Sequence, residues 1–209
     1  MNAPSVQKTV RTYAAFLDLV SGQFSAATAR HAAHCRAGCD RCCSTGLFSI
    51  SPLDALSLHY RLRRLAAPVR TRLKARSNDL LDRLERERIF FREKPLLRSA
   101  QARDQLARRS SGMRCPALDD AGRCIIYEYR PLLCRIFGPT VRGPRRMRLL
   151  EGCGCFSRDL PERDFPILSL YKDEDVLLGA LSKATGRRGV SSLSTIIPAG
   201  LALDIGTFL

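Results

Sequence analysis

The sequence lacks the features that define several large classes of protein. No segment approaches the ~18 consecutive uncharged apolar residues of a membrane-spanning helix, so we expect no membrane partner. The N-terminus has no basic segment followed by an apolar run, so we expect no secretory signal and a cytoplasmic location. The chain has 45% hydrophobic and 26% charged residues, which is ordinary for a folded chain and excludes wholesale disorder.

Lysine is also scarce, because only five of the 35 basic residues are lysine and the other 30 are arginine. Against 20 acidic residues, this gives a net charge of +15, and residues 61–109 contribute +10 of it. No aromatic residues interleave with these basic ones to stack on nucleic-acid bases. We therefore interpret the basic stretch as a solvated helical surface. Binding to nucleic acid or to an acidic protein partner is the alternative that we do not favour.

Cysteine, in contrast, is abundant, with nine residues. In a chain without an export signal, dense cysteine indicates metal or redox chemistry more often than disulfides. Closely spaced thiolates repel one another and cost free energy to form below their usual pKa of about 8.5, and a soft cation offsets both costs. Zinc and iron–sulfur clusters each bind four such thiolates. The three clusters are Cys35-x3-Cys39-x2-Cys42-Cys43, Cys115-x8-Cys124-x9-Cys134 and Cys153-x-Cys155.

The first cluster allows two local structures. On one continuous helix its four cysteines would lie at about 0°, 40°, −20° and 80° around the axis, all on one face. If Gly38 instead ends a helix, Cys39-Asp40-Arg41-Cys42 forms a knuckle that also suits a tetrahedral ion. The adjacent Cys42 and Cys43 are a poor disulfide but a reasonable pair of metal ligands.

The third cluster contains two cysteines separated by a single residue. Two donors this close rarely bind one tetrahedral ion without strain, so we expect one ligand and one bystander. Cys153 is the better candidate than Cys155, because Gly152 and Gly154 flank it and allow its backbone to approach a metal. The alternative ligands elsewhere in the sequence are His31, Asp40 and Glu151.

Arginine flanks five of the nine cysteines. A zinc ion with four thiolates carries a net charge of about −2, so neighbouring cations would stabilise it. An arginine-rich composition also produces such pairs by chance, which makes this a weaker signal than the cysteine spacing. The arginines are Arg36, Arg41, Arg114, Arg123 and Arg135.

The first two clusters, taken in order, resemble a known family. The motifs are Cys35-x3-Cys39-x2-Cys42-Cys43, then Cys115-Pro116, then Cys124-x-Ile126-Tyr127-x-x-Arg130-Pro131-x-x-Cys134-Arg135. They are similar to those of the YkgJ-type cysteine-cluster proteins, the CxxCxxCC family of zinc- or iron-chelating domains, over about residues 35–155. The resemblance implies that the metal is zinc or iron, with an iron–sulfur cluster left open. It also implies eight ligands, which we take as Cys35, Cys39, Cys42, Cys43, Cys115, Cys124, Cys134 and Cys153.

Three classes of function follow from this resemblance. The first is a metal-binding protein without an assigned biochemical role. The second is a metalloenzyme or redox protein acting with a partner, as in the bacterial flagellin lysine-N-methylases that share the cysteine domain. The chain has no glycine motif for S-adenosylmethionine, so we do not expect methyl transfer by this chain alone. The third is a nucleic-acid or protein interaction module with a structural metal. For Tyr127, Arg130 and Pro131 we favour structural roles over contact with a substrate.

Hydrophobic periodicity predicts the secondary structure around these clusters. Apolar residues at spacings of three and four predict a helix over residues 8–34, and Ser51-Pro52 is typical of a helix start. Further helices are expected over 52–62, 68–91, 98–110, 130–137, 166–184 and 192–209, a strand over 125–127, and a hairpin joining 141 to 147–149.

These elements predict a mainly α fold. We expect a small single domain of helices around a loop-rich cysteine and metal core, with a short β-hairpin. Folding and metal binding should then be linked. We divide the chain into an N-terminal helix (1–34), a cysteine-cluster domain (35–155) with a basic helical insert (52–110), and a C-terminal helical extension (156–209).

Overall fold

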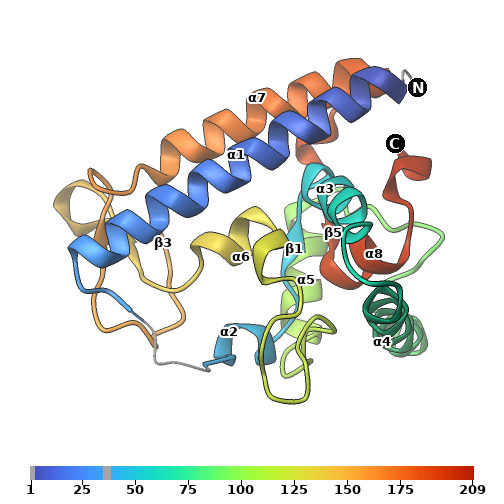
Figure 1. The fold of residues 1–209 in the computed structure, drawn as a ribbon, viewed down its shortest axis with the longest axis horizontal. Coiled ribbons are helices and arrows are strands. Elements are labelled where there is room, and N and C mark those ends of the chain that lie inside the picture. Colours follow the sequence, from blue (N-terminus) through green and yellow to red (C-terminus); the bar gives the residue numbers. More distant parts are fainter. Residues whose placement is uncertain (1–2, 35–38) are drawn as a thin grey trace.

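Two long helices lie along one side of the protein. The computed structural model describes residues 3–34 and 39–209 and is mainly α-helical, which confirms the predicted fold class. Helices α1 (Ala3–Arg30) and α7 (Ile167–Thr185) lie side by side and run in opposite directions (Figure 1). Tyr13, Leu17 and Val20, which recur on one face of α1, are fully buried in the core that α1 shares with α7. None of the described helices has the length and apolar character needed to cross a bilayer.

A second group of helices builds another part of the core. Ser51 begins α3 as predicted, because its Oγ accepts from Asp54 N at 3.1 Å and the Asp54 carboxylate accepts from Ser51 N. Helix α4 lies within the basic stretch, contributes six of its 16 basic residues and packs against α8. The helices in this group are α3 (Pro52–Leu62), α4 (Ala67–Arg86), α5 (Ala100–Arg109) and α8 (Ile197–Ala202).

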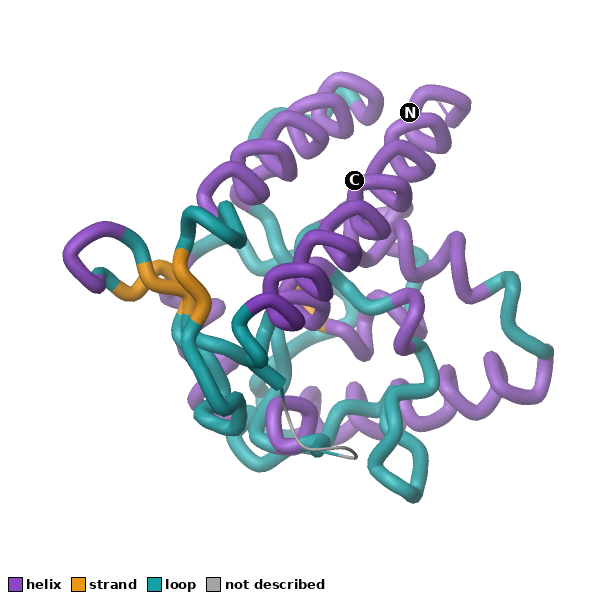
Figure 2. The backbone as a smooth tube through the Cα atoms, turned by 60° about the vertical axis from the view of Figure 1, so that its left-hand side comes forward, coloured by secondary structure: helices purple, strands orange, loops and turns teal. Residues whose placement is uncertain are grey.

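Short strands form two small sheets. The predicted hairpin is present, with β2 (Val141–Arg142) antiparallel to β3 (Arg148–Leu150) (Figure 2). Strand β4 (Leu160–Pro161) adds to β2 in parallel. A separate antiparallel pair, which periodicity did not predict, joins β1 (Ser49–Ile50) to β5 (Thr195–Ile196).

The cysteine-bearing segments contain only short helices and loops, as expected. The helices that lie among the cysteines are α2 (Arg41–Ser44), the 3₁₀ turn η1 (Tyr127–Tyr129) and α6 (Leu132–Ile136). Three further 3₁₀ turns, η2 (Pro144–Arg146), η3 (Val190–Ser192) and η4 (Ile205–Phe208), lie elsewhere.

Four sequence predictions of local structure are wrong. The helix expected over 192–209 is interrupted, because the extended backbone at Leu193 and Ile196 leads into strand β5, and only α8 and η4 are helical after it. The expected strand over 125–127 is a turn, because Tyr127 N donates to Cys124 O and Tyr129 N donates to Ile126 O. The first helix ends at Arg30, short of residue 34, since Ala32 has a left-handed φ of 47°. Helix α4 ends at Arg86 rather than at 91, and a φ of 53° at Arg88 turns the chain away.

A buried acidic cluster lies where α1, α3, α6 and α7 meet. The Tyr13 hydroxyl lies 2.9 Å from Asp54 Oδ1 and 2.7 Å from Glu174 Oε1. A hydroxyl has one hydrogen to donate, so it satisfies one carboxylate, and the second contact needs a protonated carboxyl. Burial raises the pKa of Asp54, and burial together with the charge of Asp54 raises the pKa of Glu174 to about 7. Asp54 also accepts from Leu132 N at 2.8 Å, which fixes the start of α6.

Candidate metal centre

Six cysteines from three separate segments line one cavity of about 420 Å³, which we call the cysteine cavity. Two of them lie on α2 and one just before it, two lie on the loop between α5 and η1, and one lies on α6. The structure thus brings the first and second clusters together, as a loop-rich cysteine core requires. The six are Cys39, Cys42, Cys43, Cys115, Cys124 and Cys134.

Backbone hydrogen bonds hold the loop of the second cluster against α2. Cys115 N donates to Cys43 O at 2.8 Å, which joins the two clusters directly. Leu118 forms an isolated antiparallel bridge with Cys124, and the Asp119 carboxylate accepts from the backbone amides of the turn that follows. Cys115 and Cys124 are thereby fixed on one short, closed loop.

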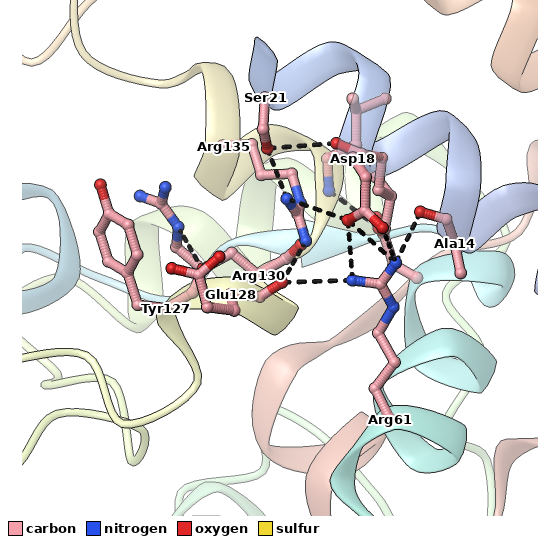
Figure 3. A network of polar contacts seen from close by, with 11 residues as sticks. Ala14, Asp18, Ser21, Arg61, Tyr127, Glu128, Arg130 and Arg135 are labelled. Carbon is pink, nitrogen blue, oxygen red and sulfur yellow. Dashed lines mark hydrogen bonds and ion pairs between the residues drawn. The ribbon is translucent and has the colours of Figure 1, made fainter. Parts of the chain in front are cut away.

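Two arginines position η1 and α6, and with them Cys134. Arg61 is buried and makes bidentate hydrogen bonds to Asp18 of α1, and it also donates to the carbonyl of Glu128 at 3.2 Å. Arg135 is buried too and donates to the carbonyls of Arg130 and Glu128, each at 2.7 Å. Figure 3 shows both guanidiniums converging between α1 and the η1 loop. Arg61 and Arg135 together, the arginine clamp, therefore fix the loop that leads into α6.

The environment of the cavity favours the protonated form of four of its thiols. Burial raises the pKa of Cys115 to about 12 and raises the pKa of Cys124 and of Cys134 as well. The hydrogen bond with Cys43, followed by burial, raises the pKa of Cys42. An ion that binds here must therefore displace protons.

The donor chemistry of the cavity fits a thiophilic ion. The Sγ atoms of Cys42 and Cys43 lie 4.0 Å apart, close to the ~3.8 Å that separates two sulfur ligands around tetrahedral zinc. Across residues 3–34 and 39–209, however, no three donor side chains are already grouped tightly enough to hold an ion.

A family comparison agrees with this geometry. Residues 34–154, more than half of the chain, match the family model CxxCxxCC, described as "Putative zinc- or iron-chelating domain". The chain belongs to the CxxCxxCC family. No curated protein and no solved structure gives a significant match.

The third cluster of this CxxCxxCC domain lies beside the cysteine cavity. Cys153 lines an adjoining cavity, and its N–H donates to Gly138 O at 2.9 Å. That approach needs Gly152, because a Cβ there would lie 2.3 Å from Gly138 O. Desolvation, and then a hydrogen bond with Cys39, raises the pKa of the Cys155 thiol. Each cysteine of the third cluster therefore has its own link to the site, and the choice of Cys153 as ligand stays a prediction.

The remaining sequence candidates are less central. Cys35 lies outside the described residues, and so does Arg36. The continuous-helix alternative for the first cluster is wrong, because Cys39 and Asp40 lie in a non-helical connection before α2. Two of the alternative donors have partners elsewhere, since His31 contacts Asp164 and Glu151 accepts from Arg148. Asp40 does line the cysteine cavity, where its carboxylate accepts from the Ser44 hydroxyl.

The flanking arginines only partly act as counter-charges for the CxxCxxCC thiols. Arg123 pairs with Asp119, and Arg135 belongs to the clamp. The charges of Arg114 and Arg41 do favour the thiolates of Cys115 and Cys155, and they oppose the rise in pKa that burial causes there. Sequence reasoning favoured a structural role for one further cation, Arg130, which flanks no cysteine. Arg130 lines the cysteine cavity and acts on both Cys124 and Cys134, where its charge favours the thiolate. Its place in the Arg130-Pro131 motif was the available signal.

Proposed function

We propose that this protein binds zinc or iron through the cysteines of the cysteine cavity. The observation that carries the proposal is that thiols from three separate segments meet at one cavity. Bound metal would supply a tetrahedral, cationic centre that cross-links these segments. The chain supplies the thiolates, the backbone bond between Cys43 and Cys115 that holds two segments in place, and the charge of Arg130.

We propose the ligand set that the family resemblance implies. Eight cysteines suffice for two four-coordinate ions or one larger cluster, which leaves a ninth as a bystander. The set is Cys35, Cys39, Cys42, Cys43, Cys115, Cys124, Cys134 and Cys153. Zinc is our preferred ion for a structural site, because the knuckle spacing of Cys39 and Cys42 suits it, and iron is the alternative.

The first experiment is anaerobic purification followed by elemental analysis and a visible spectrum. We expect at least one equivalent of zinc or iron per chain. A brown protein with sulfide-to-iron charge-transfer bands would replace zinc by an iron–sulfur cluster. Fully folded, metal-free protein with freely reactive thiols would contradict the proposal.

Single substitutions in the third cluster test the ligand assignment. Cys153→Ser should lower metal content and stability, because the Gly138 bond and Gly152 hold this backbone near the cavity. Cys155→Ser is the matched control and should change neither by much. The reverse result would assign Cys155, beside Cys39, as the ligand, and equal metal loss would indicate that all nine thiolates take part.

A role in catalysis or electron transfer with a partner is the second candidate. One observation favours it: Cys39 and Cys42 line the cysteine cavity and also a second, polar cavity, so the centre is not enclosed by protein on all sides. Metal-dependent turnover or reduction of the protein by a physiological donor would test this role.

We further propose a reducing, cytoplasmic location, since thiols must stay reduced to bind metal.

A further inference from the structure

The second cavity has a lining suited to an anion. It has a volume of about 590 Å³ and lies between α1 and the cysteine loops, and we call it the α1 cavity. Among the described residues, its lining contains one carboxylate, that of Glu128. Against this it has two guanidiniums, an imidazole and four hydroxyls, from Arg130, Arg135, His34, Ser21, Ser25, Thr28 and Tyr127.

The two arginines differ in how far the protein already uses them. Arg135 donates from Nε, Nη1 and Nη2 to a carbonyl, the Ser21 hydroxyl and a second carbonyl. Arg130 donates only from Nε, to Tyr127 O at 3.0 Å. Within the described part of the chain, its Nη1 and Nη2 atoms have no hydrogen-bond or ion-pair partner. Of the two guanidiniums in this cavity, Arg130 is therefore the one that remains available to a ligand.

Arg130 is nevertheless held in place. Its guanidinium carbon lies 3.7 Å from the centre of the Tyr127 ring, and Figure 3 shows it beside that ring, turned away from the clamp. The carbonyl of Arg130 is itself fixed by Arg135. A planar guanidinium held on one side, with both terminal nitrogens open, matches the two oxygens of a carboxylate or phosphate.

We propose that the α1 cavity binds a small organic oxyanion, whose carboxylate or phosphate group is held by Arg130. Phe24, Phe137 and Phe156 also line the cavity and would contact an apolar body of the ligand. Cys39 and Cys42 line the same space, so the bound molecule would lie next to the metal centre. This site goes beyond metal binding, because the residues that hold the anion are not metal ligands.

The test is calorimetric titration of the purified protein, with metal content measured, using three probes. Benzoate and phenyl phosphate carry the two head groups on an aromatic body, and inorganic phosphate carries the head group alone. We expect an aromatic probe to bind more tightly than inorganic phosphate, and the preferred head group to distinguish carboxylate from phosphate ligands. Absence of binding by every probe would overturn the proposal.

Variants locate the site. Arg130→Gln should weaken binding of the probe at least about tenfold. The affinity of Arg130→Lys should lie between those of Arg130→Gln and the wild type, since lysine keeps the charge but loses the two-pronged guanidinium. Arg72→Gln, on the exposed face of α4, removes the same charge and should bind as the wild type does. Equal affinity of Arg130→Gln and wild type for the probe would overturn the proposal. If that variant also lost metal, the charge of Arg130 would serve only to stabilise the thiolates.

A measurement on the wild-type chain does not depend on the folding of any variant. In ¹⁵N-resolved NMR spectra, the aromatic probe should shift the Arg130 Nε–H signal and the amides of Cys39 and Cys42. Shifts confined to the basic face of α4 would overturn the proposal. Metal content measured in the same sample separates this result from any failure of metal binding.

Discussion

The α1–α7 pair and the cysteine loops are stabilised in different ways. The two helices have 28 and 19 residues, and their apolar faces share one buried core. Around the cysteine cavity, α2 has four residues and α6 has five. Helices this short are not stable alone, because they have too few internal hydrogen bonds to offset nucleation. The cysteine loops therefore depend on cross-links, which the arginine clamp supplies on one side and a bound ion would supply on the other.

Removal of metal should produce the largest difference in stability between the two regions. After chelation of metal-loaded protein, we expect hydrogen exchange to accelerate over residues 39–47 and 113–134 and to stay slow in α1 and α7. If the ion contributes about 5 kcal/mol, the melting temperature falls by about 10–20 °C. Uniform acceleration throughout the chain would contradict the proposed division of stability.

Loss of Asp54 should weaken the point at which the regions meet. Asp54→Ala removes the acceptor of Ser51 N and Leu132 N and leaves the Tyr13 hydroxyl with Glu174 alone. We expect a loss of about 3 kcal/mol in the free energy of unfolding, measured with denaturant. Asp175→Ala, at an exposed position of α7, is the control and should have little effect. A small effect of Asp54→Ala would show that α6 is positioned without it.

The pKa of Glu174 gives the helical region a pH dependence of its own. Because its pKa is about 7 in the folded chain and 4.5 in the reference state, the folded protein binds more protons between these values. Stability is therefore fully present below pH 4.5 and falls as pH rises to about 7, by up to about 3 kcal/mol.

The difference in stability between wild type and Glu174→Gln isolates this contribution. We expect that difference to change with pH across this window, while the metal-dependent part of the stability cancels. A difference that is independent of pH would contradict the raised pKa.

The smallest effect should come from the surface of the cysteine loops. Arg123 is adjacent to Cys124 in sequence, but its exposed guanidinium pairs with Asp119. Exposed pairs contribute little, so Arg123→Gln should leave the melting temperature and the metal content unchanged within error. A clear loss of metal would instead restore Arg123 as a counter-charge for the thiolates.

Prediction from sequence succeeded where a local pattern decides the structure. The apolar stripe of α1, the Ser51 cap and the hairpin between β2 and β3 each follow from residues that are close in sequence. The helix ends were predicted less well, because nothing in the pattern shows that Ala32 and Arg88 adopt a left-handed conformation. The strand expected over 125–127 failed because two adjacent isoleucines also suit a buried turn.

Predicting the site from sequence was limited by distance along the chain. Cysteine spacing singled out clusters whose described members line one cavity in the first two cases, whereas the ligand set itself stays a prediction. The arginine clamp could not be predicted, because Arg61 and Asp18 are 43 residues apart and both residue types are common on surfaces. The role of Arg130 depends on its fixed orientation beside Tyr127, which only the folded loop provides.

The arginine clamp has a mechanical consequence. It holds α1 at Asp18 and Ser21, about 22 Å along the axis from the start of the helix. Because α1 is a stiff rod, a tilt of about 5° at this pivot displaces its N-terminal end by about 2 Å. A small adjustment of α6, such as that needed to bring Cys134 onto an ion, is therefore magnified at the far end of the molecule. A spectroscopic label near the start of α1 would report this displacement.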